Sequence, residues 1–298
     1  MKTGLRHTTF EIQGDVLLDE PLAHHTSFRI GGAARYFVKP QSVEDVSAAI
    51  AFAQSQELPW HVLGNGTNVL FDDQGFDGVV IHLGPGTDFN QVIVEEDRLY
   101  VEAGASLAAA RRASEKNGFH SMDFLVGIPA TLGGALAMNA GIPEGTIGDL
   151  ATSVIALDPH GKLQQLSQSD CEFEYRSSRI RREKLVVLAA QLNLDQGEQW
   201  DKFALMLRRK HQPNGHSPGC VFKNPSLSPK SAGWLIDKSG LKGYNVGDAQ
   251  VSCSHANFIL NRGQARSADV LALIDIVREK VYKEFNLELN LELEVVLH

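Results

Sequence analysis

The sequence has few cysteines and no excess of basic residues, and both shortages exclude classes of protein. Its three cysteines, Cys171, Cys220 and Cys253, include no closely spaced pair, so neither a disulfide framework nor a zinc cluster is expected. The formal net charge is −8, whereas a nucleic-acid-binding protein normally carries a strong basic excess. We therefore predict no metal site and no nucleic-acid partner.

The sequence also lacks an apolar signal core near its start and a segment suited to the membrane interior. The longest uncharged run, residues 124–143, approaches membrane-spanning length but contains Pro129, Asn139 and several glycines, which suit a buried loop better. With 43% hydrophobic and 21% charged residues, the composition is that of an ordinary globular protein. We expect a cytoplasmic protein with no membrane partner, and nothing in the sequence points to an obligate protein partner.

Helical and extended patterns follow one another through the first two thirds of the chain. Ser42 is typical of a helix N-cap, and behind it apolar residues recur at helical spacing: Val46, Ala49, Ile50 and Ala53. Ser106 begins a second, alanine-rich helix that should end at Gly118. Apolar segments predict strands at residues 60–63, 69–71, 92–95, 99–102, 154–157, 163–166 and 185–194.

The composition changes near residue 197, where we place a domain boundary. A helix is predicted over residues 200–210, followed by a loop rich in proline, glycine, serine and asparagine over residues 212–231. A last helix follows the apolar spacing of residues 270–281, and a final strand alternates leucine with polar residues over 287–293.

Two glycine-rich stretches could contact a ligand. Residues 64–68, Gly-Asn-Gly-Thr-Asn, lie between two predicted strands, so a hairpin is one interpretation, because Asn-Gly is a strong hairpin signal. The stretch is longer than a two-residue turn, and its exposed amides would also suit a pyrophosphate. It is not a Rossmann fingerprint, since the glycine pattern fails at Val69, nor a Walker loop, since lysine is missing.

The second stretch, residues 127–141, is dense in glycine and alanine. Such residues let a backbone approach a large flat ligand closely, and Thr131 and Asn139 could supply hydrogen bonds. Tight backbone packing within the core is the alternative explanation. We favour ligand contact for this stretch.

Six blocks of residues in chain order resemble the signatures of the UDP-N-acetylenolpyruvoylglucosamine reductase (MurB-type) family. They are residues 26–32, 63–70, 127–141, 175–178, 221–225 and 247–252. The resemblance covers nearly the whole chain and suits the shorter branch of the family. It implies an α+β fold: a vanillyl-alcohol-oxidase/PCMH-type FAD-binding domain over residues 1–197, with α/β subdomains of about 1–80 and 81–197, then a separate α/β substrate-binding domain over 198–298.

The same resemblance implies an oxidoreductase of peptidoglycan precursor synthesis. NADPH would reduce non-covalently bound FAD, and the flavin would then reduce UDP-N-acetylglucosamine enolpyruvate to UDP-N-acetylmuramate. By resemblance, the cofactor-binding residues are Gly64, Asn65, Gly66, Thr67, Asn68, Gly127, Ile128, Pro129, Thr131, Gly133, Gly134, Asn139, Ala140 and Gly141. The substrate-binding residues are Tyr175, Lys223, Asn224, Gln250 and His255.

Three residues are predicted to be catalytic. The resemblance singles out Arg176, whose guanidinium would meet the charge that develops on the enolpyruvyl carboxylate; a solvated surface arginine is the alternative. Cys220 stands where most of the family has serine, and its thiol is a stronger acid than a hydroxyl, so it could donate a proton; a small buried hydrophobe is the alternative.

Glu292 is the third candidate. Alternation along residues 287–294 does not distinguish it from Glu288 or Glu294, and the resemblance alone selects it. The family normally has proline before this glutamate, whereas here the residue is Leu291.

Two other functions remain open. One is an oxidase of the same flavin fold, in which His24 or His25 could tether FAD covalently. The other is a non-catalytic protein that binds a flavin or a UDP-sugar.

Overall fold

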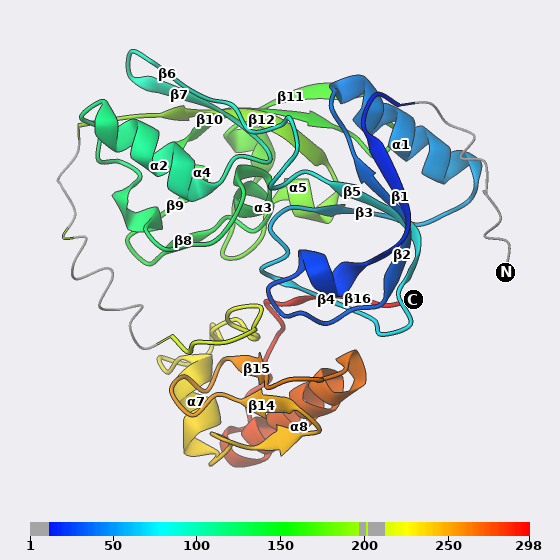
Figure 1. Cartoon of the computed structure of the whole chain (residues 1–298). Coiled ribbons are helices and arrows are strands. Elements are labelled where there is room, and N and C mark those ends of the chain that lie inside the picture. Colours follow the sequence, from blue (N-terminus) through cyan, green and yellow to red (C-terminus); the bar gives the residue numbers. More distant parts are fainter. Residues whose placement is uncertain (1–11, 197–200, 202–211) are drawn as a thin grey trace, which may run out of the picture.

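The computed structural model describes residues 12–196, 201 and 212–298. Residues 12–196 form an N-terminal lobe built on two large sheets with their helices, and residues 212–293 form a smaller C-terminal lobe beside it (Figure 1). The predicted helix over 200–210 and most of the segment around the predicted boundary at 197 lie outside the described residues.

The first sheet of the N-terminal lobe has the order β1-β2-β5-β3, with β1 antiparallel to β2 and the remaining pairs parallel. Its strands are β1 (Asp15–Pro21), β2 (Ala33–Lys39), β3 (Trp60–Leu63) and β5 (Phe76–His82). Helix α1 (Val43–Ser55) packs on β5, and it begins where predicted, because the Ser42 hydroxyl accepts a hydrogen bond from Asp45 N.

The second sheet is antiparallel throughout, in the order β11-β10-β12-β7-β6. Its strands confirm the predictions: β6 (Val92–Glu95), β7 (Arg98–Glu102), β10 (Ala151–Leu157), β11 (Leu163–Ser167) and β12 (Val186–Asn193). Helix α2 (Leu107–Lys116), capped by Ser106, and the short helix α3 (Leu132–Ala137), capped by Thr131, pack against this sheet. The other short elements of this lobe are η1 (Leu22–His25), η2 (Asp123–Leu125), β8 (Gly141–Ile142), β9 (Gly145–Thr146), α4 (Ile147–Leu150), η3 (Ser169–Cys171) and α5 (Arg179–Arg182).

The C-terminal lobe packs two helices on a small antiparallel sheet. Its elements are α7 (Ala232–Lys238), β13 (Asn245–Val246), β14 (Ala249–Val251), β15 (Ile259–Asn261) and α8 (Ser267–Phe285). Helix α8 buries the apolar residues whose spacing predicted it.

The last strand returns to the N-terminal lobe. Strand β16 (Glu294–Val296) pairs in parallel with β4 (Val69–Phe71) (Figure 1). The strand predicted over 287–293 is therefore wrong: this segment is irregular, and its one bridge joins Leu291 to Phe222. The hairpin interpretation of residues 64–68 is also wrong, because β3 and β4 belong to different sheets.

The uncharged run over residues 124–143 folds as part of the N-terminal lobe. It supplies parts of η2 and β8 and the whole of α3, which is more regular structure than the predicted loop. Among the described residues, we find no helix with the length and apolar character needed to cross a membrane.

The two lobes share one hydrophobic core. Phe28, Ile30 and Leu70 come from the N-terminal lobe, yet they pack in the same buried cluster as Val221, Leu235 and Ile274 of the C-terminal lobe. This shared core holds the two lobes in contact through Phe28, Ile30 and Leu70.

We predict that Phe28→Ala lowers the free energy of unfolding by about 3–5 kcal/mol, because it leaves a cavity where a fully buried ring joins the lobes. Urea unfolding followed by tryptophan fluorescence measures the change. Leu18→Ala is the control, since Leu18 is 39% exposed on β1, and it should change stability by about 0.5 kcal/mol or less. Equal effects of the two substitutions would contradict the shared core.

Candidate active site

A cleft of about 630 Å³ runs between the glycine-rich loops of the N-terminal lobe and the segments around residues 217–220 and 292–294. Of the residues predicted to bind the cofactor, those on its wall are Gly64, Asn65, Gly66, Thr67, Asn68, Gly127, Ile128, Pro129, Thr131, Gly134, Ala140 and Gly141. The fold therefore brings together two stretches that are 60 residues apart in the sequence.

The loop at residues 64–68 offers its backbone to a ligand. Within the described residues, none of its five amides donates a hydrogen bond. The side chains of Asn65 and Thr67 both donate to the Pro129 carbonyl at 3.1 Å, which fixes this loop against the second stretch. Gly66 has a φ of 60°, and a Cβ there would collide with the His25 carbonyl oxygen. The free amides in a glycine-shaped cradle fit the pyrophosphate of FAD.

Two predicted cofactor residues stand behind the cleft wall. A Cβ on Gly133 would lie 3.3 Å from the Ala103 Cβ, so this glycine serves close packing of α3. The Asn139 side chain donates to the Glu174 carbonyl at 3.0 Å and accepts from Gly148 N at 3.0 Å. The second stretch thus combines a ligand-facing wall with tight core packing.

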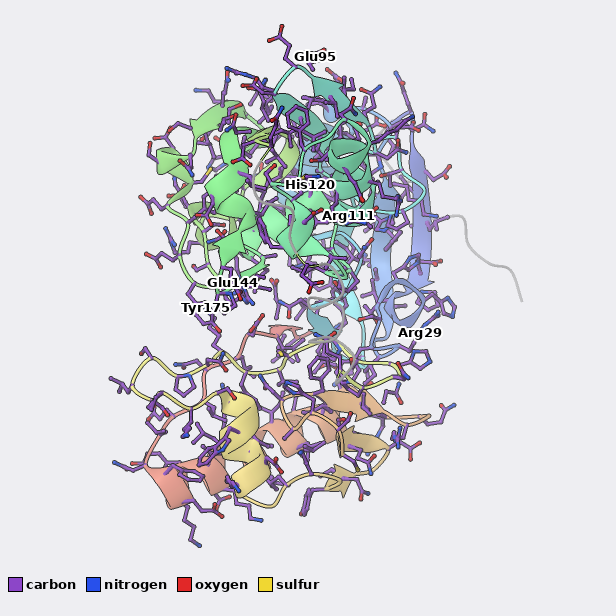
Figure 2. The ribbon with its side chains drawn as sticks, turned by 90° about the vertical axis from the view of Figure 1, so that its left-hand side faces the viewer. Arg29, Glu95, Arg111, His120, Glu144 and Tyr175 are labelled. Atoms are coloured by element: carbon purple, nitrogen blue, oxygen red, sulfur yellow. The ribbon has the colours of Figure 1, made fainter. Side chains whose placement is uncertain are left out.

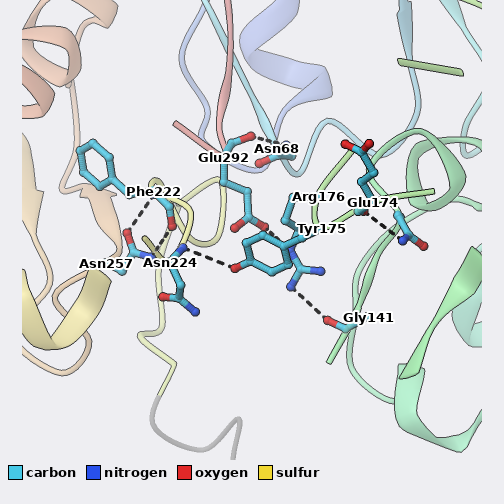
Figure 3. A network of polar contacts seen from close by, with 10 residues as sticks. Asn68, Gly141, Glu174, Tyr175, Arg176, Phe222, Asn224, Asn257 and Glu292 are labelled. Atoms are coloured by element: carbon cyan, nitrogen blue, oxygen red, sulfur yellow. Dashed lines mark hydrogen bonds and ion pairs between the residues drawn. The ribbon is translucent and has the colours of Figure 1, made fainter. Parts of the chain in front are cut away.

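Arg176 projects from a tight turn at the cleft. Its φ of 54° lies in the left-handed region, which is uncommon for an arginine and turns its side chain out of the turn between Glu174 and Ser177. Arg176 Nε donates to Glu292 Oε1 at 2.9 Å, and Nη2 donates to the Gly141 carbonyl at 3.0 Å (Figure 3). A solvated surface arginine is therefore the wrong interpretation of this residue.

Glu292 is the one of the three candidate glutamates that contacts Arg176. Its backbone N donates to the Val221 carbonyl at 2.9 Å, and its own carbonyl accepts from Asn68 Nδ2 at 3.1 Å. Burial raises the pKa of its carboxyl, and Arg176 opposes the rise. Glu294 instead faces His61 at 3.9 Å, and Glu288 lies in a separate surface groove.

Cys220 lines the same cleft. Its backbone forms a bridge with Phe258, and burial, followed by the nearby Glu292 charge, raises the pKa of its thiol to about 12. The thiol is therefore protonated at neutral pH and can act as an acid. Cys171, by contrast, is fully buried in the core, and Cys253 is exposed.

The predicted substrate residues lie beyond the cleft wall, on the side of the C-terminal lobe. Tyr175 extends from the N-terminal lobe toward the C-terminal lobe (Figure 2), where its hydroxyl oxygen accepts from Asn224 N at 3.4 Å. Burial and then the positive charge of Arg181 lower the pKa of Lys223. Gln250 and His255 are farther away and bond within their own lobe: Gln250 donates to the Gly243 carbonyl, and His255 Nδ1 accepts from Asn257 N.

The comparisons with known proteins agree with this geometry. The family described as UDP-N-acetylenolpyruvoylglucosamine reductase, C-terminal domain, matches residues 211–296, and the FAD binding domain family matches residues 34–167. A UDP-N-acetylenolpyruvoylglucosamine reductase of Heliobacterium modesticaldum is 40% identical over 97% of this chain and 93% of that protein. The corresponding protein of Moorella thermoacetica is 41% identical over 94% of this chain and 93% of that protein. The chain belongs to the UDP-N-acetylenolpyruvoylglucosamine reductase family.

Solved structures confirm the predicted fold class of this family member. The reductase of Thermus caldophilus superposes with a TM-score of 0.77 at 33% identity, covering 96% of this chain and 100% of that one. The 6-hydroxy-D-nicotine oxidase of Arthrobacter nicotinovorans has a TM-score of 0.50 at 16% identity, covering 82% of this chain and 52% of that one, and it shows a common fold alone. The N-terminal lobe is thus an FAD-binding domain of the PCMH type, and the protein is an FAD-dependent oxidoreductase.

The covalent tether considered for an oxidase has no support in the position of the histidines. Neither His24 nor His25 lies on the cleft wall. His25 pairs with Glu20 at 2.8 Å and stacks on Phe37 with ring centroids 4.2 Å apart. Its position serves the packing of the first sheet.

Sequence reasoning missed Arg181, Ser27 and Asn257. Arg181 lies on the cleft wall and has no acidic partner among the described residues, whereas Arg179 pairs with Glu183 at 2.9 Å. The sequence contained a signal for this difference between the two arginines. Four positions after Arg179 is a glutamate, which can pair with it on a helix, whereas four positions after Arg181 is Leu185. The Ser27 hydroxyl donates to the Ser217 carbonyl at 2.7 Å, which ties the Cys220 segment to the N-terminal lobe.

We predict that iodoacetamide at neutral pH modifies Cys253 at least roughly tenfold faster than Cys220, because the thiolate is the reactive form. Mass spectrometry of the two cysteine peptides over time gives both rates. The rate at Cys220 should continue to rise about tenfold per pH unit between about pH 8 and 10, since its pKa is about 12. A plateau in this range would mean a much lower pKa.

Proposed function

We propose that this protein reduces UDP-N-acetylglucosamine enolpyruvate to UDP-N-acetylmuramate with NADPH, in the cytoplasmic synthesis of peptidoglycan precursor. The observation that carries the proposal is the Arg176–Glu292 pair beside a protonated Cys220 at one cleft with the flavin cradle. FAD, when bound, supplies the hydride that the methylene carbon of the enolpyruvyl group receives. The protein then has to hold a carboxylate, stabilise charge and donate one proton.

Arg176 is the group that meets the substrate carboxylate. Addition of hydride to the methylene carbon moves an electron pair toward the neighbouring carbon and its carboxylate, which becomes enolate-like. Glu292 and the Gly141 carbonyl occupy Nε and Nη2 of Arg176, so the Nη1 donors remain for the substrate. A guanidinium already fixed by two partners needs no reorganisation when this charge develops.

Cys220 is the proton donor. Its thiol keeps its proton at neutral pH until a carbanionic carbon forms beside it, and transfer to that carbon completes the reduction. The thiolate left behind is stabilised by the charge of Arg176, whereas Glu292 favours its reprotonation. Hydride and proton together account for the two hydrogen atoms that the double bond gains.

Lys223 and Arg181 provide positive charge for the substrate diphosphate. Burial and then the charge of Arg181 lower the pKa of Lys223, which places the two cations near each other. Neither has a carboxylate partner within the described residues. Such a pair suits an anionic substrate even though the net charge of the protein is −8.

We predict that Cys220→Ala leaves flavin reduction by NADPH intact and slows flavin reoxidation by the enolpyruvyl substrate, roughly a hundredfold or more. Anaerobic stopped-flow absorbance of the flavin band measures both half-reactions. Cys220→Ser, the matched variant, should keep much of the activity because a hydroxyl can also donate the proton.

Three outcomes would contradict this function in different ways. Equal loss of both half-reactions in Cys220→Ala would remove the proton-donor role. Bleaching by NADPH that only oxygen reverses would favour a flavin oxidase. Bound flavin that NADPH does not reduce would favour a binding protein.

We predict that Arg181→Ala raises the KM for the enolpyruvyl substrate roughly tenfold or more with little change in kcat, because it removes charge that binds the ground state and the transition state alike. Steady-state kinetics with saturating NADPH measures both constants. Arg179→Ala is the matched control from the same helical turn, and its KM should not change. A fall in kcat alone for Arg181→Ala would assign this arginine to the chemical step instead.

A further inference from the structure

Asn257 is buried beside the Cys220 segment. It is 4% exposed, lies just before β15, and uses its whole carboxamide on one neighbour. Oδ1 accepts from Phe222 N at 2.9 Å, and Nδ2 donates to the Phe222 carbonyl at 2.8 Å (Figure 3). The backbone carbonyl of Asn257 also accepts from Val221 N at 2.9 Å.

The opposite side of the same segment is bonded to the residues around Glu292. The Val221 carbonyl accepts from Glu292 N at 2.9 Å, and Lys223 N donates to the Asn290 carbonyl at 2.8 Å. Residues 220–223 are thus held between Asn257 on one side and residues 290–293 on the other. Burial raises the pKa of the Cys220 thiol, and the neighbouring Asn257 side chain opposes that rise.

We propose that Asn257 is a positioning residue that holds the Cys220 thiol in register with Glu292, so that its proton reaches the substrate carbon. The proposal rests on the proton-donor role of Cys220 proposed above. It assigns Asn257 no contact with the substrate or the flavin, since the carboxamide acts through the backbone of Phe222.

The carboxamide is needed because the Phe222 backbone presents a donor and an acceptor together. An asparagine matches both with one planar group. An ionised aspartate matches only Phe222 N–H and turns a carboxylate oxygen toward the Phe222 carbonyl. Phe222 is itself buried, so water cannot replace the lost partner.

Asn261 offers a matched control in the same lobe. It is 5% exposed, donates through Nδ2 to the Phe28 carbonyl at 3.1 Å, and accepts through Oδ1 from Gly263 N at 2.9 Å. Its side chain also joins separate backbone segments, but it has no hydrogen bond to residues 220–223. An Asn→Asp change removes one amide donor at either position.

The test compares Asn257→Asp with Asn261→Asp, both as flavin-loaded enzymes, in the two anaerobic half-reactions. For Asn257→Asp we expect flavin reduction by NADPH within about twofold of the parent enzyme, and reoxidation by the enolpyruvyl substrate between roughly ten- and a hundredfold slower. The solvent deuterium isotope effect on reoxidation should rise, because transfer of the thiol proton then limits the rate. Asn261→Asp should leave the ratio of the two rates unchanged.

A pH series adds a readout that a purely structural role would not move. At acid pH the introduced carboxyl becomes protonated and can donate to the Phe222 carbonyl while accepting from Phe222 N, so reoxidation by Asn257→Asp should recover as the pH falls. The titratable groups that face this position are Cys220, Glu292 across Val221, and His255, whose Nδ1 accepts from Asn257 N. Burial lowers the pKa of His255, which opposes its protonation at acid pH. The parent enzyme provides the reference profile.

Several outcomes would overturn the proposal. Normal reoxidation in Asn257→Asp, an equal loss of both half-reactions, or the same selective loss in Asn261→Asp would each do so. If Asn257→Asp does not retain flavin, Asn257→Ser is judged by the same ratio of rates. Failure of the proposed function is recognised separately, because the enolpyruvyl substrate would then not reoxidise the flavin of the parent enzyme. Normal reoxidation in Cys220→Ala would instead remove the proton-donor role, and with it the basis for positioning at Asn257.

Discussion

The ion pair between Arg176 and Glu292 joins parts of the chain that are 116 residues apart, and the site depends on it. Both side chains are largely withdrawn from water, which makes an isolated charge at either position costly. The pairing offsets this cost, and Arg176 also donates to the Gly141 carbonyl. Asn68 holds the Glu292 backbone in place. Removal of Glu292 would leave Arg176 without its carboxylate partner, and removal of Arg176 would leave Glu292 with only the charges of Lys223 and Arg181 to oppose the effect of burial.

The segment that shapes the cofactor wall also shapes the turn that carries Arg176. Asn139 and Arg176 both have left-handed backbone conformations, with φ values of 43° and 54°, and such strain persists only where neighbouring groups enforce it. The Asn139 side chain bonds to the Glu174 carbonyl, and the buried Ser178 hydroxyl donates to the Ala137 carbonyl at 2.8 Å. The cofactor wall and the arginine are therefore one rigid unit, and neither can be displaced without disturbing the other.

Local patterns predicted most of the fold, and non-local contacts account for the rest. The serine caps at Ser42 and Ser106 and the apolar strands act over a few residues, so the sequence reveals them. The leucine alternation over 287–293 wrongly predicted a strand. Leu289 and Leu293 are indeed buried in the C-terminal core, but the backbone of this segment bonds to Val221 and Lys223 without forming a regular ladder. The resemblance selected Arg176 and Cys220. Periodicity could not show which of Glu292 and Glu294 enters the site, because this depends on how residue 294 pairs with residues 68 and 69. Asn257 carries no local signal at all.

The pairing of β16 with β4 also has a consequence for the order in which the molecule assembles. Its register joins Val69 to Glu294, so a very long loop must close before the two strands meet. Contacts of such sequence separation form late, because their closure entropy is lost before any bond is gained. Glu292 sits two residues before this strand and reaches Arg176 only when the strand is in place. A folding intermediate can therefore hold both sheets of the N-terminal lobe, and even the flavin cradle, while it still lacks a complete catalytic centre.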